Sequence, residues 1–302
     1  MEARTASALS LKGPIVWLDM DQEELDHAYD QAVYAPNHNQ IAKRRLVNSL
    51  TARAWLGEPE RLSYGPAPIE GLDFYRCAAP NVPIAIFVHG GAWRSGTASE
   101  YAFLAEPFVH AGAHVAIPDF INVEEADGSL FPMVEQVRRA LGFLYKNAQR
   151  LGGNRNRLYM MSQSSGSHLA GCVVASDWTK EGLPTDIIKG ALLSSGMYDL
   201  KPVRLSKRSR YVKFTDTMEG ELSAIRHLDR INTPLVLSYG TCETPEFQRQ
   251  TRNFAAALIA AGKPVELLIG EGYNHFEMLE TLANPYGLLG RAMLTLMGLS
   301  KA

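Results

Sequence analysis

The sequence of 302 residues predicts an α/β fold: a mostly parallel, doubly wound sheet with helices on both faces, preceded by a helical extension. The first supporting observation is that short apolar runs alternate with helical patterns from residue 83 to residue 269, at intervals suited to crossover connections. The second is that two of these runs end in turns of small residues, where parallel strands present their carboxyl ends. The length fits a single domain, residues 1–302.

The N-terminal part, residues 1–60, is expected to form the helical extension. Residues 19–56 are rich in helix formers, and their apolar side chains recur at spacings of three and four, which predicts one or two surface helices. Residues 34–37, with the sequence Tyr-Ala-Pro-Asn, interrupt this pattern. These helices would either form a homodimer surface or cover the sheet.

The strands begin with two weak signals at residues 62–64 and 72–77, which flank a Pro/Gly cluster and predict a hairpin. Stronger apolar runs predict strands at residues 83–88, 113–120, 157–162, 188–195, 234–239 and 264–269. Helical patterns lie between them at residues 100–111, 132–151, 165–176, 219–228 and 245–261.

The basic segment of residues 201–216 has little periodicity and is predicted to be a long loop. Two interpretations stay open for residues 200–217. The segment is either a solvated basic loop or a lid whose arginines hold an acidic substrate group by bidentate pairing.

Composition narrows the kind of partner. Apolar residues make up 46% of the chain, charged residues 21%, and the formal net charge is -2, so there is no electrostatic reason to expect nucleic acid or an anionic membrane. The default is a small-molecule partner. Residues 1–14 lack a signal-peptide pattern and no long apolar run occurs, which predicts a cytoplasmic protein. The cysteines Cys77, Cys172 and Cys242 are widely separated, so neither a disulfide framework nor a metal site is expected.

A candidate nucleophile lies in residues 159–169, with the sequence Tyr-Met-Met-Ser-Gln-Ser-Ser-Gly-Ser-His-Leu, which is typical of a buried strand, a tight turn and a helix. In the G-x-S-x-G turn, small flanking residues allow strand and helix to pass closely and expose the serine hydroxyl. Here Ser162 and Gly166 flank Ser164. The alternative is an ordinary helix-capping serine.

A second turn follows the apolar run of residues 83–88, with the sequence His89-Gly90-Gly91-Ala92-Trp93. Backbone N–H groups after such a strand bind the oxyanion of a tetrahedral intermediate, together with the N–H of the residue after the nucleophile. The predicted donors are therefore Gly91 or Ala92 and Ser165. A simple glycine turn is the alternative.

A serine nucleophile needs a histidine base oriented by a carboxylate, in the chain order serine, acid, histidine. His275 lies in a glycine-rich loop after the last strand and is the predicted base. His227 is expected at the surface of a helix and His168 in packing, while His89 is expected to make structural hydrogen bonds.

Residues 239–246, Tyr-Gly-Thr-Cys-Glu-Thr-Pro-Glu, leave the strand before the last one and supply two carboxylates. Glu243 is the predicted acid because it lies in the loop. Glu246 follows Pro245 and suits the first turn of a helix, where a carboxylate is favourable. Asp199, after the preceding strand, is the alternative acid.

Five motifs are spread over most of the chain: Tyr29-Asp30-Gln31 with Val33, His89-Gly90-Gly91-Ala92-Trp93, residues 194–200 (Ser-Ser-Gly-Met-Tyr-Asp-Leu), residues 245–250 (Pro-Glu-Phe-Gln-Arg-Gln) and Asn274-His275-Phe276. Together they resemble the kynurenine formamidase (arylformamidase) branch of the α/β-hydrolases. The resemblance implies an α/β-hydrolase fold and a serine hydrolase with a Ser164, Glu243 and His275 triad that uses neither a metal nor another cofactor.

Two departures from that family are visible. The family usually has Gly-His-Ser-Ala-Gly at the nucleophile, where residues 162–166 read Ser-Gln-Ser-Ser-Gly, and it usually has aspartate where Glu243 stands. Both departures indicate a substrate other than the family's commonest one.

The expected reaction is cleavage of an N-formyl or N-acyl amide of a small molecule through an acyl-enzyme. Trp93, Tyr198 and Phe276 are expected to line an apolar substrate pocket, although core packing is an equal alternative for Tyr198. Two competing functions are a carboxylesterase acting on aryl or short-chain esters and a noncatalytic binding protein with a hydrolase-like pocket.

Overall fold

The computed structural model describes residues 12–300, which build an eight-stranded sheet in the order β1-β2-β4-β3-β5-β6-β7-β8. The predicted hairpin of β1 (Glu60–Ser63) and β2 (Gly71–Tyr75) is antiparallel, and β2 also pairs antiparallel with β4 (His114–Pro118). All later pairings are parallel. The remaining strands are β3 (Val82–Val88), β5 (Gly153–Gln163), β6 (Gly190–Ser194), β7 (Leu235–Gly240) and β8 (Val265–Gly270). The predicted mostly parallel sheet is confirmed.

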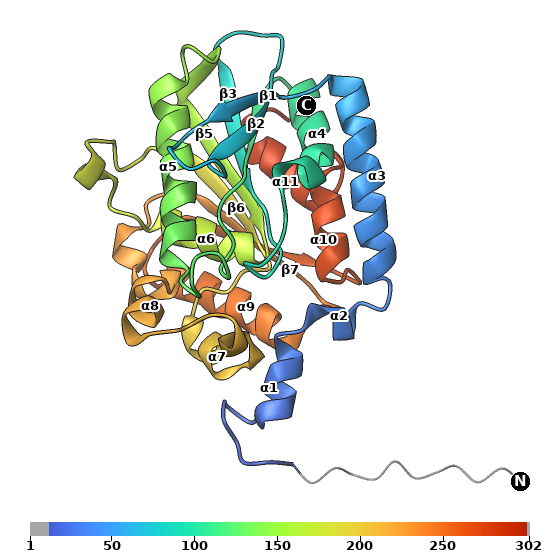
Figure 1. Ribbon diagram of the computed structural model, residues 1–302, viewed down its shortest axis with the longest axis vertical. Coiled ribbons are helices and arrows are strands. Elements are labelled where there is room, and N and C mark those ends of the chain that lie inside the picture. Colours follow the sequence, from blue (N-terminus) through green and yellow to red (C-terminus); the bar gives the residue numbers. More distant parts are fainter. Residues whose placement is uncertain (1–11, 301–302) are drawn as a thin grey trace, which may run out of the picture.

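Helices cover both faces of this sheet (Figure 1). One face carries α5 (Phe131–Asn147), α6 (Ser165–Val174) and α9 (Pro245–Ala260). The other carries α3 (His38–Leu56), α4 (Ala105–His110), α10 (His275–Leu282) and α11 (Leu288–Leu296). Side chains alternate along a strand, so Ile84, Ile86 and Val88 of β3 pack on the first face, and Ala85 and Phe87 pack on the second. Because both faces of β3 are buried, nearly every residue of this strand has to be apolar, as residues 83–88 are.

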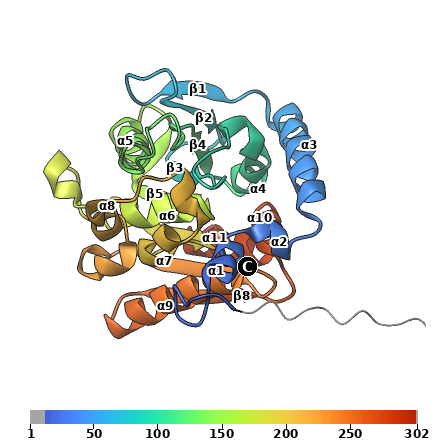
Figure 2. The ribbon, with the colours of Figure 1, turned by 60° about the horizontal axis from the view of Figure 1, so that its bottom comes forward.

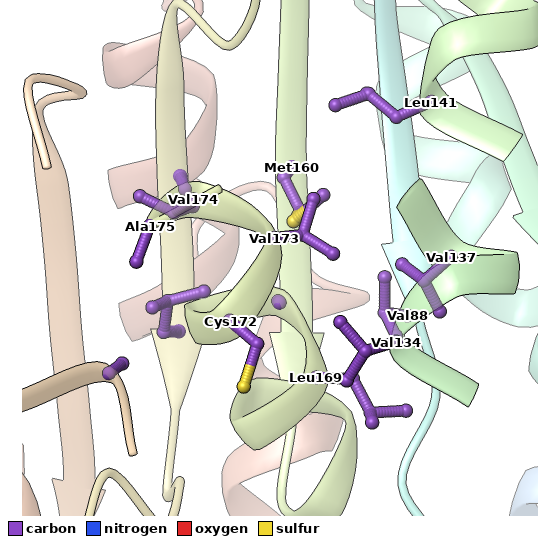
Figure 3. Close-up of a cluster of buried hydrophobic side chains, with 14 of the residues drawn as sticks. Val88, Val134, Val137, Leu141, Met160, Leu169, Cys172, Val173, Val174 and Ala175 are labelled. Atoms are coloured by element: carbon purple, nitrogen blue, oxygen red, sulfur yellow. The ribbon is translucent and has the colours of Figure 1, made fainter. Parts of the chain in front are cut away.

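The core beneath α6 holds the start of that helix in place (Figure 3). Leu169 and Val173 of α6 belong to one buried apolar cluster with Val137 of α5 and Met160 of β5. All four side chains are fully buried. Because interiors are packed to crystal-like density, α6 has little freedom to move relative to β5. The turn between β5 and α6 is therefore rigid.

The N-terminal extension forms three helices rather than the one or two expected: α1 (Gln22–Ala28), α2 (Gln31–Tyr34) and α3. The expected interruption occurs at residues 35–37. In Figure 1, α1 lies below the sheet, α2 lies between α1 and the lower end of α3, and α3 rises beside α4. Figure 2 shows α1 close to α9, which it contacts. The first part of the predicted extension, residues 1–11, lies outside the described residues.

The basic segment after β6 is not the predicted loop. It contains α7 (Leu200–Leu205) and a 3₁₀ turn, Lys207–Arg210, and is followed by α8 (Asp216–Glu221). Asp199, Ser206 and Thr215 each cap one of these short helices through a side-chain oxygen. Helices of one or two turns are too short to show a periodic apolar pattern, which is why this prediction was wrong.

The predicted helix at residues 219–228 is also wrong, since α8 ends at Glu221 and two 3₁₀ turns follow. Near the C-terminus, α10 and α11 are additional helices that no predicted element covered. They bury Met278, Leu282 and Met293 against the second face of the sheet.

Candidate active site

Ser164 occupies a strained turn at the carboxyl end of β5. Its backbone has φ 60° and ψ −129°, a conformation that costs a non-glycine residue about 1–3 kcal/mol and must be held by its surroundings. The Ser164 N–H donates to the Ser194 carbonyl oxygen at 2.9 Å, which ties the turn to β6. The side chain of Ser164 lines a cavity. The structure thus has the sharp strand-to-helix turn that the sequence predicted.

The residues that flank Ser164 explain how the turn is built. A Cβ atom on Gly166 would lie 2.2 Å from the Val88 carbonyl oxygen, so only glycine fits there. At the other flank, the Ser162 hydroxyl donates to the Leu192 carbonyl oxygen at 3.3 Å and lies 3.0 Å from the Ser167 hydroxyl. The departure from glycine at residue 162 is therefore accommodated by buried hydrogen bonds and leaves the turn intact.

The turn after β3 has the backbone of an anion-binding loop. Gly91, Ala92 and Trp93 have φ angles of 113°, 56° and 64°. The Trp93 N–H donates to the Ser165 Oγ at 3.2 Å, which joins this turn to the start of α6. Within residues 12–300, the N–H groups of Gly91, Ala92 and Ser165 have no hydrogen-bond acceptor. Gly91 and Ala92 line the cavity, whereas Ser165 is buried and does not border it. Free backbone N–H donors beside a cavity can receive a negatively charged oxygen.

His89 has the structural role that the sequence predicted. Its ring is stacked on Phe120 at 4.3 Å and on Tyr101 at 5.3 Å between ring centroids, and its Nδ1 lies 2.9 Å from the Gly90 carbonyl oxygen. Burial lowers the pKa of His89. The stacked His89 ring, held neutral by burial, therefore supports the adjacent turn of Gly90 and Gly91.

His275 and Glu243 form a buried pair. The His275 Nδ1 lies 2.7 Å from the Glu243 Oε2. His275 is the first residue of α10, and the preceding Asn274 caps that helix, so the ring is placed at a helix start rather than within the loop. The side chain of His275 lines the same cavity as Ser164.

The Glu243 carboxylate is fully satisfied although it is 98% buried. Its Oε1 accepts from the Ser195 hydroxyl at 2.6 Å and from the Gly240 N–H at 2.7 Å. Its Oε2 accepts from the Gln31 Nε2 at 3.3 Å, in addition to the contact with His275. A buried carboxylate needs such partners, because an unpaired one is costly. These donors hold the carboxylate in one orientation toward His275.

Gln31 is a contribution of the N-terminal extension that the sequence analysis did not place in the site. Besides its bond to Glu243, its Oε1 accepts from the Thr244 N–H at 3.2 Å. The side chain is buried. Gln163, next to Ser164, is a second such residue, since its Nε2 donates to the His275 carbonyl oxygen at 3.1 Å. Both glutamines stand in motifs that the sequence singles out, Tyr29-Asp30-Gln31 and residues 162–166, but neither motif specifies which distant group the glutamine side chain contacts.

The cavity has a volume of about 750 Å³ and is bordered by segments far apart in the chain. Gly91, Ala92 and Phe276 line it as expected. The extension contributes Tyr29, Asp30, Gln31, Ala32, His38, Ile41, Ala42 and Arg45, and the segment after α7 contributes Lys207, Arg208, Arg210 and Tyr211. The volume is in the range of small-molecule sites.

Two aromatic residues predicted to line the pocket lie in the core instead. Tyr198 is 1% exposed and stacks on Phe254 with ring centroids 4.3 Å apart. Trp93 is 2% exposed and packs edge-on against His168. Neither residue borders the cavity. Contacts with residues far apart in the chain turn both rings into the core, which sequence position alone does not reveal. The packing role predicted for His168 is confirmed.

The other carboxylates and the other histidine considered from the sequence make structural contacts outside the cavity. Asp199 caps α7 by accepting from the Lys201 N–H at 3.1 Å. Glu246 lies in the first turn of α9 and pairs with Arg249 at 2.5 Å. His227 lies 3.0 Å from the Gly220 carbonyl oxygen through its Nε2, within a 3₁₀ region rather than a regular helix. None of these side chains borders the cavity.

Comparisons with known proteins agree with this fold. The BD-FAE family model matches residues 72–194. A thermophilic esterase from Thermogutta terrifontis superposes with a TM-score of 0.66 at 19% identity, covering 82% of this chain and 98% of the esterase. The chain is also 28% identical over 239 residues to the isoprenylcysteine alpha-carbonyl methylesterase ICME of Arabidopsis thaliana, covering 71% of this chain and 56% of that protein.

The kynurenine formamidase of Danio rerio is similar over nearly its whole length. The two chains are 30% identical over 297 residues, which cover 94% of this chain and 99% of the fish protein. The kynurenine formamidase of Salmo salar is 28% identical over 300 residues. The chain therefore belongs to the kynurenine formamidase-like branch of the α/β-hydrolases, and it is a hydrolase of amide or ester bonds.

Proposed function

We propose that the protein hydrolyses an N-formyl or N-acyl arylamide of a small molecule, with Ser164 as nucleophile, His275 as base and Glu243 as the orienting acid. The observation that carries the proposal is the buried 2.7 Å contact between the His275 Nδ1 and Glu243, made beside the cavity that Ser164 also lines. A histidine held in this way at Nδ1 directs Nε2 toward the substrate side.

In the proposed reaction, His275 Nε2 removes the Ser164 hydroxyl proton as the Oγ attacks the carbonyl carbon. The resulting oxyanion is stabilised by the free N–H groups of Gly91, Ala92 and Ser165. His275 then donates its proton to the amide nitrogen, the C–N bond breaks and the amine leaves. Water, deprotonated by His275, then attacks the carbonyl carbon of the acyl-enzyme. The bond to the Ser164 Oγ breaks as His275 returns the proton to that oxygen, which releases the carboxylic acid and restores the Ser164 hydroxyl. No cofactor takes part.

The Ser164 and His275 side chains form no direct hydrogen bond among the residues that the structure describes. Catalytic hydrogen bonds are often long in unliganded enzymes and tighten in the substrate complex. The proposal therefore expects this bond to form when substrate fills the cavity.

We propose an amide rather than an ester as the substrate because the similarity to the formamidases spans 94% of the chain, whereas the similarity to the methylesterase spans 71%. The second candidate is a carboxylesterase acting on aryl or short-chain esters, which that methylesterase similarity favours. Formanilide and phenyl formate differ only in the atom that leaves. A turnover of phenyl formate far in excess of that of formanilide, after correction for spontaneous hydrolysis, would favour the esterase.

The test of the nucleophile is mass spectrometry of the intact protein after exposure to a fluorophosphonate. We expect one adduct on the wild type and none on Ser164→Ala, together with loss of turnover and an unchanged circular dichroism spectrum. Ser162→Ala is a matched control that removes a neighbouring hydroxyl and retains labelling. Absence of an adduct on the wild type would contradict the proposal and favour a noncatalytic binding protein.

Four features expected from the sequence remain predictions: a lid, a homodimer, a cytoplasmic location and a single domain. We propose that the cover formed by residues 200–217 acts as a lid, since its 3₁₀ turn borders the cavity.

The homodimer is supported by Leu46, Val47 and Leu50, which are exposed apolar side chains of α3, and sedimentation would test it. The cytoplasmic location and the single domain also stay predictions. Separately, none of the helices in residues 12–300 combines the length and the hydropathy that a transmembrane helix needs.

A further inference from the structure

Arg208 is a buried cation at the wall of the cavity. It lies in the 3₁₀ turn Lys207–Arg210 of the basic segment, and only 6% of the residue is exposed. Arginine is rarely buried to this extent unless it is paired. Its guanidinium has no carboxylate within 4.0 Å among residues 12–300.

The partners of Arg208 are neutral. Nη1 donates to the Tyr211 hydroxyl at 2.9 Å, and Nη2 donates to the Tyr29 carbonyl oxygen at 3.2 Å. Nε is buried without a partner within the described part of the chain. A guanidinium has five N–H donors. Three of them therefore have no acceptor among the residues that the structure describes.

The other cationic side chains that border the cavity are each paired with a carboxylate. Arg45 contacts Glu100 at 2.8 Å, Arg94 contacts Glu124 at 2.7 Å, Lys207 contacts Asp30 at 2.5 Å and Arg210 contacts Asp26 at 3.5 Å. Arg208 thus differs from its neighbours in both burial and pairing. The acidic side chains that border the same cavity do not compensate its charge by direct contact.

Two aromatic rings hold the Arg208 guanidinium. Its Cζ lies 5.4 Å from the centroid of the Trp93 ring and 6.0 Å from that of Phe247. Such contacts stabilise a cation but leave its N–H donors unused. Burying a charge without an opposite charge is unfavourable, and an incoming anion would relieve that cost.

The same rings connect Arg208 to the reacting groups. Phe247 packs edge-on against the His275 ring with centroids 5.1 Å apart, and Trp93 belongs to the turn that carries Gly91 and Ala92. A single small molecule in a cavity of about 750 Å³ can therefore reach both the nucleophile and the guanidinium.

We infer that Arg208 is the anion-binding residue of this cavity and that the substrate carries a carboxylate, which the remaining N–H donors on Nη1 and Nη2 of Arg208 hold. The inference rests on the proposed function for the position of the scissile bond, but the binding of the anion does not require turnover. Arg208, one residue of the cover, would then determine the selectivity of the enzyme for acidic over neutral acyl compounds. Planar guanidinium donors match the geometry of a carboxylate.

The experiment is a fluorescence titration of the full chain with 2-aminobenzoate and with neutral 2-aminobenzamide, which has nearly the same shape. We expect the wild type to bind the acid about 10-fold to 100-fold more tightly than the amide, the range for hydrogen bonds to a charged group. Arg208→Gln should lower the affinity for the acid to that for the amide and leave the affinity for the amide unchanged. Arg208→Lys should retain part of the preference.

Arg204→Gln is the matched control. Arg204 belongs to the same cover, pairs with Asp216 and Glu219 and does not border the cavity, so its loss should leave the preference for the acid unchanged. Circular dichroism confirms the fold of each variant. Bound 2-aminobenzoate should also slow the labelling of Ser164 by fluorophosphonate in the wild type.

Equal affinities of the wild type for acid and amide, or no binding of the acid at millimolar concentration, would overturn the inference without any variant. A folded Arg208→Gln that kept the preference would do the same and would leave Arg208 as a structural link between Tyr29 and Tyr211. Failure of the proposed function is recognised separately, because an enzyme without an activated Ser164 takes no adduct yet still shows the preference for the acid.

Discussion

At the scale of the residue, Glu243 shows how a buried carboxylate is oriented. Four donors surround it: Ser195, the Gly240 N–H, Gln31 and His275. The first three are neutral donors, which fix the position of the carboxylate oxygens and leave Oε2 in contact with the His275 Nδ1. The glutamate, one methylene longer than the family's usual aspartate, is thus fully accommodated.

Glu243→Gln is expected to lower kcat by about 10,000-fold, because an amide nitrogen can face the His275 Nδ1 and force the wrong tautomer. Steady-state kinetics on formanilide measures the effect. Glu243→Asp is the control that keeps the charge and should retain part of the activity. Wild-type turnover by a folded Glu243→Gln would exclude Glu243 as the orienting acid.

Gln31→Ala is expected to lower kcat by up to about 10-fold, the value of a typical hydrogen bond, with little change in KM. Gln31 acts through Glu243 and is a positioning residue. The readout is the separate measurement of kcat and KM, and the uncharged Gln31→Met distinguishes loss of the amide from loss of volume. Gln22→Ala, in the neighbouring α1, serves as the control; a rise in KM alone would show that Gln31 acts on substrate binding instead.

At the scale of the element, the turn between β5 and α6 depends on close contact between backbones. Gly166 faces the carbonyl oxygens of Val88 and His89, at 2.2 Å and 2.5 Å from the position that a Cβ would take. This contact brings the turn after β3 beside Ser164. The geometry of the candidate oxyanion site is therefore a property of how α6 meets β3.

Gly166→Ala is expected to lower the free energy of unfolding by more than about 2 kcal/mol and to abolish labelling of Ser164, because backbone atoms cannot move aside without displacing β3. Urea unfolding followed by circular dichroism measures the change. Gly171→Ala is the matched control in the same helix, where the nearest atom to the new Cβ lies 3.4 Å away. Equal stability of the two variants would show that α6 shifts freely.

At the scale of the whole molecule, buried histidines tie stability to pH. Burial lowers the pKa of His168 to about 4, and burial also lowers the pKa values of His89 and His114. Between about pH 4 and the unfolded value near 6.5, the unfolded chain binds more protons than the folded one. The free energy of unfolding therefore falls as the pH decreases through this window.

From His168 alone we expect a loss of about 2 kcal/mol on going from pH 7 to pH 5. Urea unfolding at a series of pH values measures the slope. His168→Gln should flatten the slope, and His27→Gln, at an exposed position, should not. An unchanged slope in His168→Gln would mean that other groups dominate the acid sensitivity.

The sequence by itself determined the alternation of strands and helices and the order of Ser164, Glu243 and His275 along the chain. These features are local, because strand runs, tight turns and helix caps depend on neighbouring residues. The carboxyl ends of parallel strands meet at one edge, so residues predicted on separate loops were brought together at the cavity. The sequence therefore identified the parts of the candidate site that lie at strand ends.

Only the tertiary structure decided which distant segments complete the cavity. Gln31 reaches Glu243 from α2, Arg208 enters from a short turn, and Trp93 and Tyr198 turn into the core. Each outcome depends on contacts between residues far apart in the chain, which leave no periodic or compositional pattern. The physical reason is that packing selects one face of each segment, and the sequence of the segment alone does not specify what that face will meet.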